Sequence, residues 1–248
     1  MATVIEFDNV SYSAGGRAIL RDFNLRVDEG ETLVLLGRSG SGKTTALKLV
    51  NGLLLPERGR VLVEGKPTSQ WDLIRLRRRI GYVIQETGLF PHFTVRDNVG
   101  LVPRLERWEE LRIASRVDGL LEQVGLPPRE YAARYPHQLS GGQRQRTGVA
   151  RALANDPPIL LFDEPFGAVD PVTRNELQKQ FLKLRDELRK TALFVTHDTR
   201  EALRLGTRIA LLSGGKLIFL GSGDQFMRSQ DAEAQAFLET IALSASSE

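Results

Sequence analysis

The chain has 248 residues, with 34 Lys and Arg against 31 Asp and Glu, a formal net charge of +3 and no cysteine. A chain of this length can bury roughly 70–75% of its unfolded surface, so its core needs no disulfide. Without thiols it has neither a cysteine nucleophile nor cysteine-bound zinc. The small charge excess does not indicate a nucleic-acid partner. Because no apolar run approaches the ~20 residues of a membrane span, we expect a cytosolic protein.

The N-terminal third predicts strands followed by a helix. Thr3–Tyr12 and Phe23–Val27 alternate apolar and polar residues, as half-buried strands do. Thr32–Leu36 is apolar enough for a strand buried on both faces. A helix should begin at the glycine-rich segment Gly37–Gly42 and run to about Leu54. Two further strands are predicted at Gly59–Glu64 and Arg79–Ile84, with a short arginine-rich helix between them.

Strand patterns disappear from Thr94 to about Ala154, where apolar residues recur at helical spacing. One helix there should end at Gly125, and another should start near Gly141. A long helix is then expected at Pro171–Lys190. Strands return at Ile159–Phe162, Ala192–Val195, Arg208–Leu212 and Leu217–Leu220. This order predicts an α/β core interrupted by an all-helical insertion.

The segment after the buried strand fits the phosphate-binding pattern G-x-x-x-x-G-K-[ST]. It reads Gly37-Arg38-Ser39-Gly40-Ser41-Gly42-Lys43-Thr44. The glycines let successive backbone N–H groups face one concavity, and the following helix adds about half a positive charge at its N-terminus. Lys43 can reach the β- and γ-phosphates, and the Thr44 hydroxyl can bind Mg²⁺. The pattern therefore predicts a site for a nucleoside triphosphate and Mg²⁺.

Two adjacent acids follow a second buried strand, in Ile159-Leu160-Leu161-Phe162-Asp163-Glu164. Ligands of open parallel sheets bind at the carboxyl ends of the strands. Asp163 can hold Mg²⁺ through water, while Glu164 polarises the water that attacks the γ-phosphate. General-base catalysis of this kind typically contributes 10²–10⁴-fold.

A third motif, Leu139-Ser140-Gly141-Gly142-Gln143, makes the combination resemble the nucleotide-binding subunits of ATP-binding cassette (ABC) transporters. Four more family markers follow in order: Tyr12, Gln85, the D-loop-like Gly167-Ala168-Val169-Asp170, and His197. Gly167 stands where the family often has serine. The resemblance covers residues 3 to 225.

The resemblance implies a P-loop NTPase core with an N-terminal antiparallel β subdomain and an inserted all-helical subdomain. The whole chain, 1–248, is expected to form one nucleotide-binding domain, in which a helical subdomain, 87–155, interrupts the core segments 1–86 and 156–248. Tyr12 is expected to stack on adenine, Gln85 to reach Mg²⁺ and the attacking water, and His197 to hydrogen-bond the γ-phosphate. The expected catalytic residues are Lys43, Gln85, Glu164 and His197, and the expected metal ligands are Thr44, Gln85 and Asp163. The expected ATP contacts are Tyr12, Gly37, Arg38, Ser39, Gly40, Ser41, Gly42, Lys43, Thr44, Thr45, Ser140, Gly141, Gly142 and Gln143.

The partners follow from the same resemblance. Two copies are expected to pack head to tail, so that the Ser140–Gly142 helix start of one copy closes over the ATP held by Lys43 of the other. ATP then favours the closed dimer, and hydrolysis removes the γ-phosphate contacts. Further expected partners are transmembrane permease subunits and, indirectly, a substrate-binding protein. The expected location is the cytoplasmic face of the cell inner membrane, as a peripheral subunit.

The segment Ile80–His92, with its continuation Asn98–Pro103, looks like the ATPases of importers for glycine betaine, choline, carnitine and related quaternary amines. Many of those proteins carry a C-terminal pair of regulatory domains. This sequence stops at Glu248, so we expect no ionic-strength gating through such a tail.

Two alternatives share the same motor motifs. An exporter, or an ATPase that extracts lipids or lipoproteins, differs in its membrane subunits, which a pull-down or the neighbouring reading frames would identify. A soluble ABC ATPase acting on nucleic acid or the ribosome is disfavoured. DNA-repair relatives insert long coiled coils between the positions of Gln85 and Ser140, where this chain has no sustained heptads, and translation-factor relatives carry two P-loops. A GTPase is disfavoured because no [NT]-K-x-D sequence follows the P-loop.

Overall fold

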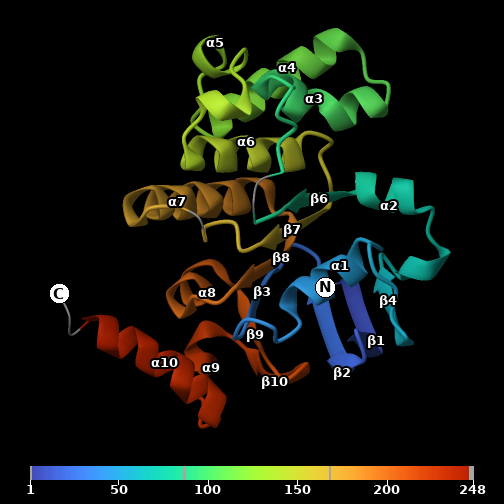
Figure 1. The fold of residues 1–248 in the computed structure, drawn as a ribbon, viewed down its shortest axis with the longest axis vertical. Helices are drawn as coiled ribbons and strands as arrows, with labels where there is room; N and C mark the ends of the chain where they lie inside the picture. Colours follow the sequence, from blue (N-terminus) through green and yellow to red (C-terminus); the bar gives the residue numbers. More distant parts are fainter. Residues whose placement is uncertain (1, 86–87, 168, 246–248) are drawn as a thin grey trace. The chain divides into compact units, whose positions relative to one another are not determined.

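The computed structural model describes residues 2–85, 88–167 and 169–245 and has an α/β fold (Figure 1). It divides into two compact units, described one at a time. The first unit contains Met1–Arg77 and Lys190–Glu248, and the second contains Arg78–Arg189. The expected helical subdomain, 87–155, falls within the second unit. Its first residue, Thr87, lies outside the described residues.

An antiparallel sheet in the first unit has the strand order β2-β1-β4-β5. Its strands are β1 (Thr3–Ala14), β2 (Arg17–Asp28), β4 (Arg58–Val63) and β5 (Lys66–Pro67). Alternating side chains fill its inner face, where Phe7 and Phe23 pack edge to face with ring centroids 5.1 Å apart. This confirms the predicted N-terminal antiparallel strands, which extend a few residues further than their apolar patterns.

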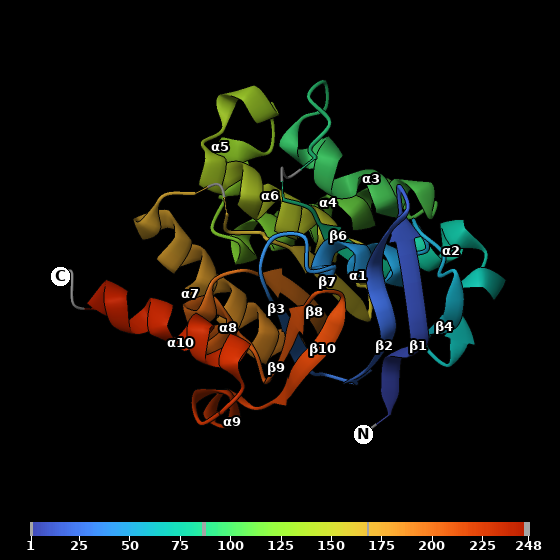
Figure 2. The ribbon, with the colours of Figure 1, turned by 60° about the horizontal axis from the view of Figure 1, so that its bottom comes forward.

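The other strands of the first unit run in the order β10-β9-β3-β8. They are β3 (Thr32–Leu36), β8 (Thr191–Thr196), β9 (Arg208–Ser213) and β10 (Lys216–Gly221). The central strand β3 is parallel to β8 and β9, and all five of its residues are buried, which explains its continuous apolar sequence. The helices of this unit are α1 (Lys43–Val50), η1 (Thr68–Gln70), α8 (Thr199–Leu205), α9 (Gly223–Met227) and α10 (Ala232–Ala245), and α2 (Leu73–Arg78) crosses the boundary. Figure 2 shows α10 beside α8, with which it packs.

The second unit combines a pair of parallel strands with helices. The strands are β6 (Ile80–Val83) and β7 (Ile159–Asp163). The helices are α3 (Val95–Leu105), α4 (Glu110–Gln123), α5 (Pro128–Tyr131), η2 (Pro136–Gln138), α6 (Gly141–Leu153) and α7 (Pro171–Leu188). Helix α3 packs against α4 and α6, and the predicted absence of strands from Thr94 to Ala154 is confirmed.

Candidate functional site

The phosphate loop, residues 37–42, connects buried β3 to α1 in the first unit. Gly42 has a φ of 105°, which disfavours any residue with a side chain. A Cβ atom at Gly42 would lie 2.7 Å from Leu20 Cδ2 and 3.0 Å from the carbonyl oxygen of Ile19. At Gly37 a Cβ would collide with the carbonyl oxygen of Leu212. The loop therefore lies against neighbouring backbone and side chains as closely as glycine allows.

Lys43, the first residue of α1, is buried against this loop, with 5% of its surface exposed. Its Nζ donates hydrogen bonds to the carbonyl oxygens of Gly37, at 2.6 Å, and Arg38, at 3.0 Å. Ser41 Oγ is also buried, and among the described residues it has no hydrogen-bond partner. A cationic centre, an unsatisfied hydroxyl and a glycine backbone suit a polyphosphate, so the residues present fit ATP.

The described residues do not form a metal site from protein ligands alone. Over residues 2–85, 88–167 and 169–245, no three His, Asp or Glu side chains cluster closely enough to hold a metal ion. Mg²⁺ is commonly bound through one or two protein oxygens together with substrate phosphates and water. Thr44, half-buried in the first turn of α1 beside Thr45, is suited to be such a ligand.

Tyr12 is placed next to the phosphate loop by the hairpin of β1 and β2. It is half-buried and pairs with Leu20, whose side chain is the one that lies against Gly42. The first unit thus brings together a partly exposed aromatic ring and the phosphate loop, although they are about 30 residues apart. This proximity suits a ring that stacks on a purine, a role that stays a prediction.

His197 follows β8 and is exposed. The parallel register pairs Leu36 with Thr196, so His197 and Gly37 come directly after neighbouring strands at the same end of the sheet. Asp198 fixes this turn by capping α8, where it accepts hydrogen bonds from the backbone N–H groups of Arg200 and Glu201. An open cavity of about 340 Å³ lies here, lined by His197, Asp198, Thr199, Arg200, Thr240 and Ile241.

The second unit carries the two predicted acids in different environments. Asp163 is the last residue of β7 and is buried, whereas Glu164 is partly exposed and has a φ of 45°. A left-handed backbone is unfavourable for a glutamate, and such conformations are common at functional sites. The Gly167 N–H donates to the carbonyl oxygen of Glu164 and holds the turn in place.

Tyr82, a residue that the sequence motifs do not identify, contacts Asp163. Its hydroxyl donates a hydrogen bond to Asp163 Oδ2 across 3.2 Å. Burial, and secondly the nearby Asp163 carboxylate, raise the pKa of Tyr82 well above its ordinary range, so the phenol remains a donor at neutral pH. The contact fixes one oxygen of the acid expected to hold Mg²⁺.

Gln85 lies in a turn two residues beyond β6 and is exposed. We predicted that the strand before it runs to Ile84; in the structure the strand ends at Val83, which pairs with Phe162. Gln85 and Asp163 therefore both lie beyond this register, at the same end of the parallel pair. Glu86 and Thr87, which follow, lie outside the described residues.

The signature motif forms the start of α6, as predicted. Ser140 Oγ accepts a hydrogen bond from the Gln143 N–H at 3.2 Å, and Gln143 Oε1 accepts one from the Ser140 N–H at 2.9 Å. This is a capping box, so both residues stabilise the helix start in addition to any role toward phosphate. A Cβ at Gly142 would collide with the side chain of Thr173 in α7, so this glycine also permits close helix packing.

The D-loop-like motif leads into α7. Asp170 is the N-cap of that helix and accepts hydrogen bonds from the backbone N–H groups of Val172 and Thr173. Hydrogen bonding from the Thr173 side chain, and secondly from its backbone N–H, lowers the pKa of Asp170. Ala168 of the same motif lies outside the described residues.

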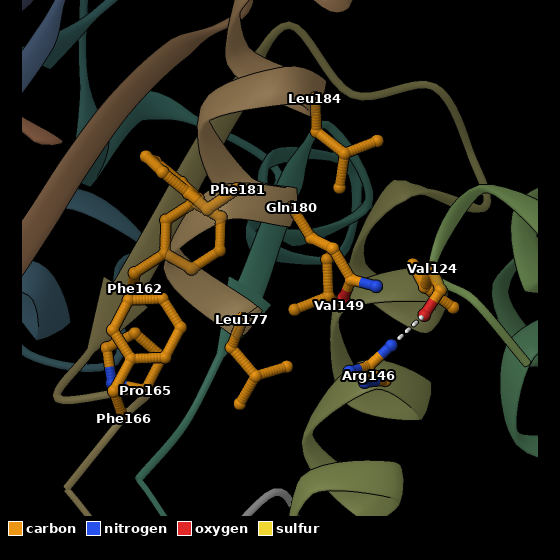
Figure 3. Close-up of a pocket in the computed structure, with 10 residues that line it drawn as sticks. All are labelled: Val124, Arg146, Val149, Phe162, Pro165, Phe166, Leu177, Gln180, Phe181 and Leu184. Atoms are coloured by element: carbon orange, nitrogen blue, oxygen red, sulfur yellow. Dashed lines mark hydrogen bonds between the residues drawn. The ribbon is translucent and has the colours of Figure 1, made fainter. Parts of the chain in front are cut away.

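A small apolar cavity lies behind the acid-bearing strand in the second unit (Figure 3). Phe162 of β7 and Phe181 of α7 meet edge to face with centroids 5.1 Å apart, and Arg146 donates to the carbonyl oxygen of Val124 at 3.2 Å. The cavity measures about 20 Å³, room for about one water molecule, so it is not a nucleotide site. Its lining residues anchor β7, and with it Asp163, to the helices.

These elements define a class of protein, because a buried strand, a glycine-rich loop and a helix in this order make a P-loop nucleotide-binding domain. Within the described residues, no helix has the length and apolar character needed to cross a membrane.

Comparisons with known proteins identify the family. Residues 20–167 match the family model described as "ABC transporter". The choline transport ATP-binding protein OpuBA of Bacillus subtilis (strain 168) is 46% identical over 227 residues, which are 91% of this chain and 59% of that protein. The glycine betaine uptake system ATP-binding protein YehX of Escherichia coli (strain K12) is 47% identical over 219 residues, 88% of this chain and 71% of that protein. The chain belongs to the ABC transporter family.

Comparison with solved structures gives the same family. The dimeric post-hydrolysis structure of the ATP-binding cassette MJ0796, bound to ADP and Pi, has a TM-score of 0.79 and 35% identity, covering 88% of this chain and 98% of that one. This likeness confirms the predicted ABC ATPase fold.

Proposed function

We propose that this chain binds and hydrolyses Mg-ATP and powers uptake through a membrane permease. The observation that carries the proposal is the phosphate loop, in which buried Lys43 is held on the carbonyl oxygens of Gly37 and Arg38. The lysine is thus already positioned before any phosphate arrives, and exchanging two neutral carbonyl partners for phosphate oxygens strengthens its interactions.

In this proposal each motif residue has one task. Lys43 and the loop N–H groups bind the β- and γ-phosphates, and Thr44, Gln85 and Asp163 hold Mg²⁺, which neutralises phosphate charge when bound. Glu164 accepts a proton from the attacking water, and His197 hydrogen-bonds the γ-phosphate. Tyr12 stacks on adenine without reading a base-specific group, so the stacking gives little selectivity among purine nucleotides.

The motor acts as a head-to-tail dimer in which Ser140, Gly141, Gly142 and Gln143 of one copy close over the ATP of the other. The dimeric structure of the related cassette supports this pairing. The two named relatives support an osmoprotectant such as choline or glycine betaine as the cargo, and carnitine belongs to the same class of quaternary amines. The chain spans 59% of the length of OpuBA. The proposed assembly also contains the permease and a substrate-binding protein, and it places this chain on the cytoplasmic face of the inner membrane.

Trapping the dimer tests this function. Glu164→Gln should stop hydrolysis but retain ATP, so light scattering should show a dimer in saturating Mg-ATP and a monomer without nucleotide. The wild-type chain should hydrolyse ATP slowly, and Lys43→Ala in the Glu164→Gln background should remain monomeric. A Glu164→Gln variant that stays monomeric at saturating Mg-ATP contradicts the proposed dimer.

A further inference from the structure

The phosphate loop is connected to the C-terminal helix by an ion pair within the first unit. Arg38 Nε lies 2.7 Å from Glu233 Oε1, and Arg38 Nη2 donates to Glu233 Oε2 at 3.4 Å. These residues are 195 positions apart in the sequence. Arg38 is the second residue of the phosphate loop, and its carbonyl oxygen is one of the two that hold Lys43. One residue thus links the ion pair to the lysine.

The helix that carries Glu233 is anchored in the core of the first unit. Ala234 and Phe237 are buried in its first two turns, and the Thr199 hydroxyl donates to the carbonyl oxygen of Phe237 at 3.1 Å. Asp231 caps the helix by accepting hydrogen bonds from the backbone N–H groups of Glu233, at 2.9 Å, and Ala234. Glu233 is therefore presented from a fixed helix, and its side chain is only 23% exposed.

We propose that Glu233 is a positioning residue for the phosphate loop. By holding the Arg38 guanidinium at two points, it restricts the backbone at the start of the loop and keeps the Arg38 carbonyl oxygen where Lys43 requires it. A loop already held in its binding conformation loses less conformational entropy when it binds phosphate. The inference rests on the proposed function, because it assumes that this loop binds ATP.

An effect of the Glu233 charge alone would change ATP affinity in the opposite direction. The Glu233 carboxylate neutralises a cation on a loop that binds anions, so its removal would tighten ATP binding if simple charge dominated. The geometry favours positioning, because Arg38 is 68% exposed and water screens its charge. The two effects change the dissociation constant of ATP in opposite directions.

The experiment measures binding of the fluorescent analogue MANT-ATP to the purified full chain with Mg²⁺. Glu233→Gln should raise the dissociation constant about two- to fivefold, the size expected for an exposed ion pair. The maximal hydrolysis rate should be unchanged, and Glu233→Asp should recover part of the affinity. In an Arg38→Gln background, Glu233→Gln should have no further effect, and the difference should vanish at about 1 M salt, where the Debye length is about 3 Å.

Glu239→Gln, an exposed glutamate on the same helix, is the matched control and should bind as wild type does. Equal affinities of Glu233→Gln and Glu239→Gln, or tighter binding by Glu233→Gln, overturn the positioning role. A wild-type chain that binds no MANT-ATP overturns the proposed function instead.

Discussion

Tyr82 and Asp163 are joined across two parallel strands, with the phenol hydroxyl donating to a carboxylate oxygen 3.2 Å away. Tyr82 lies opposite Leu161 in the strand register, and side chains two residues apart point to the same face, so Asp163 is on the same face as Tyr82. The hydrogen bond occupies one oxygen of the carboxylate and restricts its rotation.

Tyr82→Phe should therefore weaken the response to Mg²⁺. A hydrogen bond to a charged group contributes about 1.5–3 kcal/mol, so we expect ATP hydrolysis at limiting Mg²⁺ to fall by at least about tenfold. Saturating Mg²⁺ should restore most of the rate. A Mg²⁺ titration of ATP hydrolysis measures this, with the exposed Tyr135→Phe as control. Superimposable titration curves for wild type and Tyr82→Phe would show that the hydroxyl does not assist metal binding.

Ser140→Ala should separate ATP binding from hydrolysis. The cap hydrogen bond to the Gln143 N–H is lost, which destabilises α6 by about 1 kcal/mol. The phosphate loop of the same chain is untouched, so MANT-ATP binding to the monomer should remain near wild type while turnover falls strongly. If Ser140→Ala weakens monomer binding as much as Lys43→Ala does, the signature does not act on the other copy's nucleotide.

Phe181→Ala should destabilise the fold. Phe181 is 8% exposed and packs edge to face on Phe162, so truncation enlarges an existing cavity and should cost about 3–5 kcal/mol. Urea denaturation measures the loss, and Lys179→Ala, at an exposed position of the same helix, should change stability by less than about 0.5 kcal/mol. A Phe181→Ala midpoint equal to that of Lys179→Ala would contradict the packing in Figure 3.

Asp97 should make the stability of α3 depend on pH. Its hydrogen bond with the Thr94 hydroxyl, and secondly those with Arg104, lower its pKa. Because the folded pKa is depressed, the stabilisation is present above the unfolded value of about 3.9 and is lost as pH falls through the folded value. The side chain is 39% exposed, so we expect only about 0.5 kcal/mol.

Denaturation of Asp97→Asn and wild type at several pH values checks this. The variant should be less stable at pH about 7, and the difference should shrink toward pH about 3. A difference that stays constant over this range would assign the effect to helix capping by a neutral group rather than to the charge.

Local sequence patterns predicted most of the strands and the motifs, but they predicted no element for α8, α9 or α10. The run Thr32–Leu36 is the buried strand β3 to the residue, and Pro171, preceded by the capping Asp170, begins α7. One helix end was wrong: we predicted that α1 runs to Leu54, and it ends at Val50 because Gly52 adopts a φ of 65°, a C-terminal signal that the sequence does contain.

Tertiary structure alone decided which distant residues meet. The register of β6 on β7 brings Tyr82 to Asp163, and the docking of α10 brings Glu233 to Arg38. No spacing in the chain encodes either pair, because register and docking depend on how buried faces pack across long separations. The motifs can be recognised in the sequence because their chemistry is local. The side chains that hold the motifs in position are decided by which distant residues the packed core places beside them.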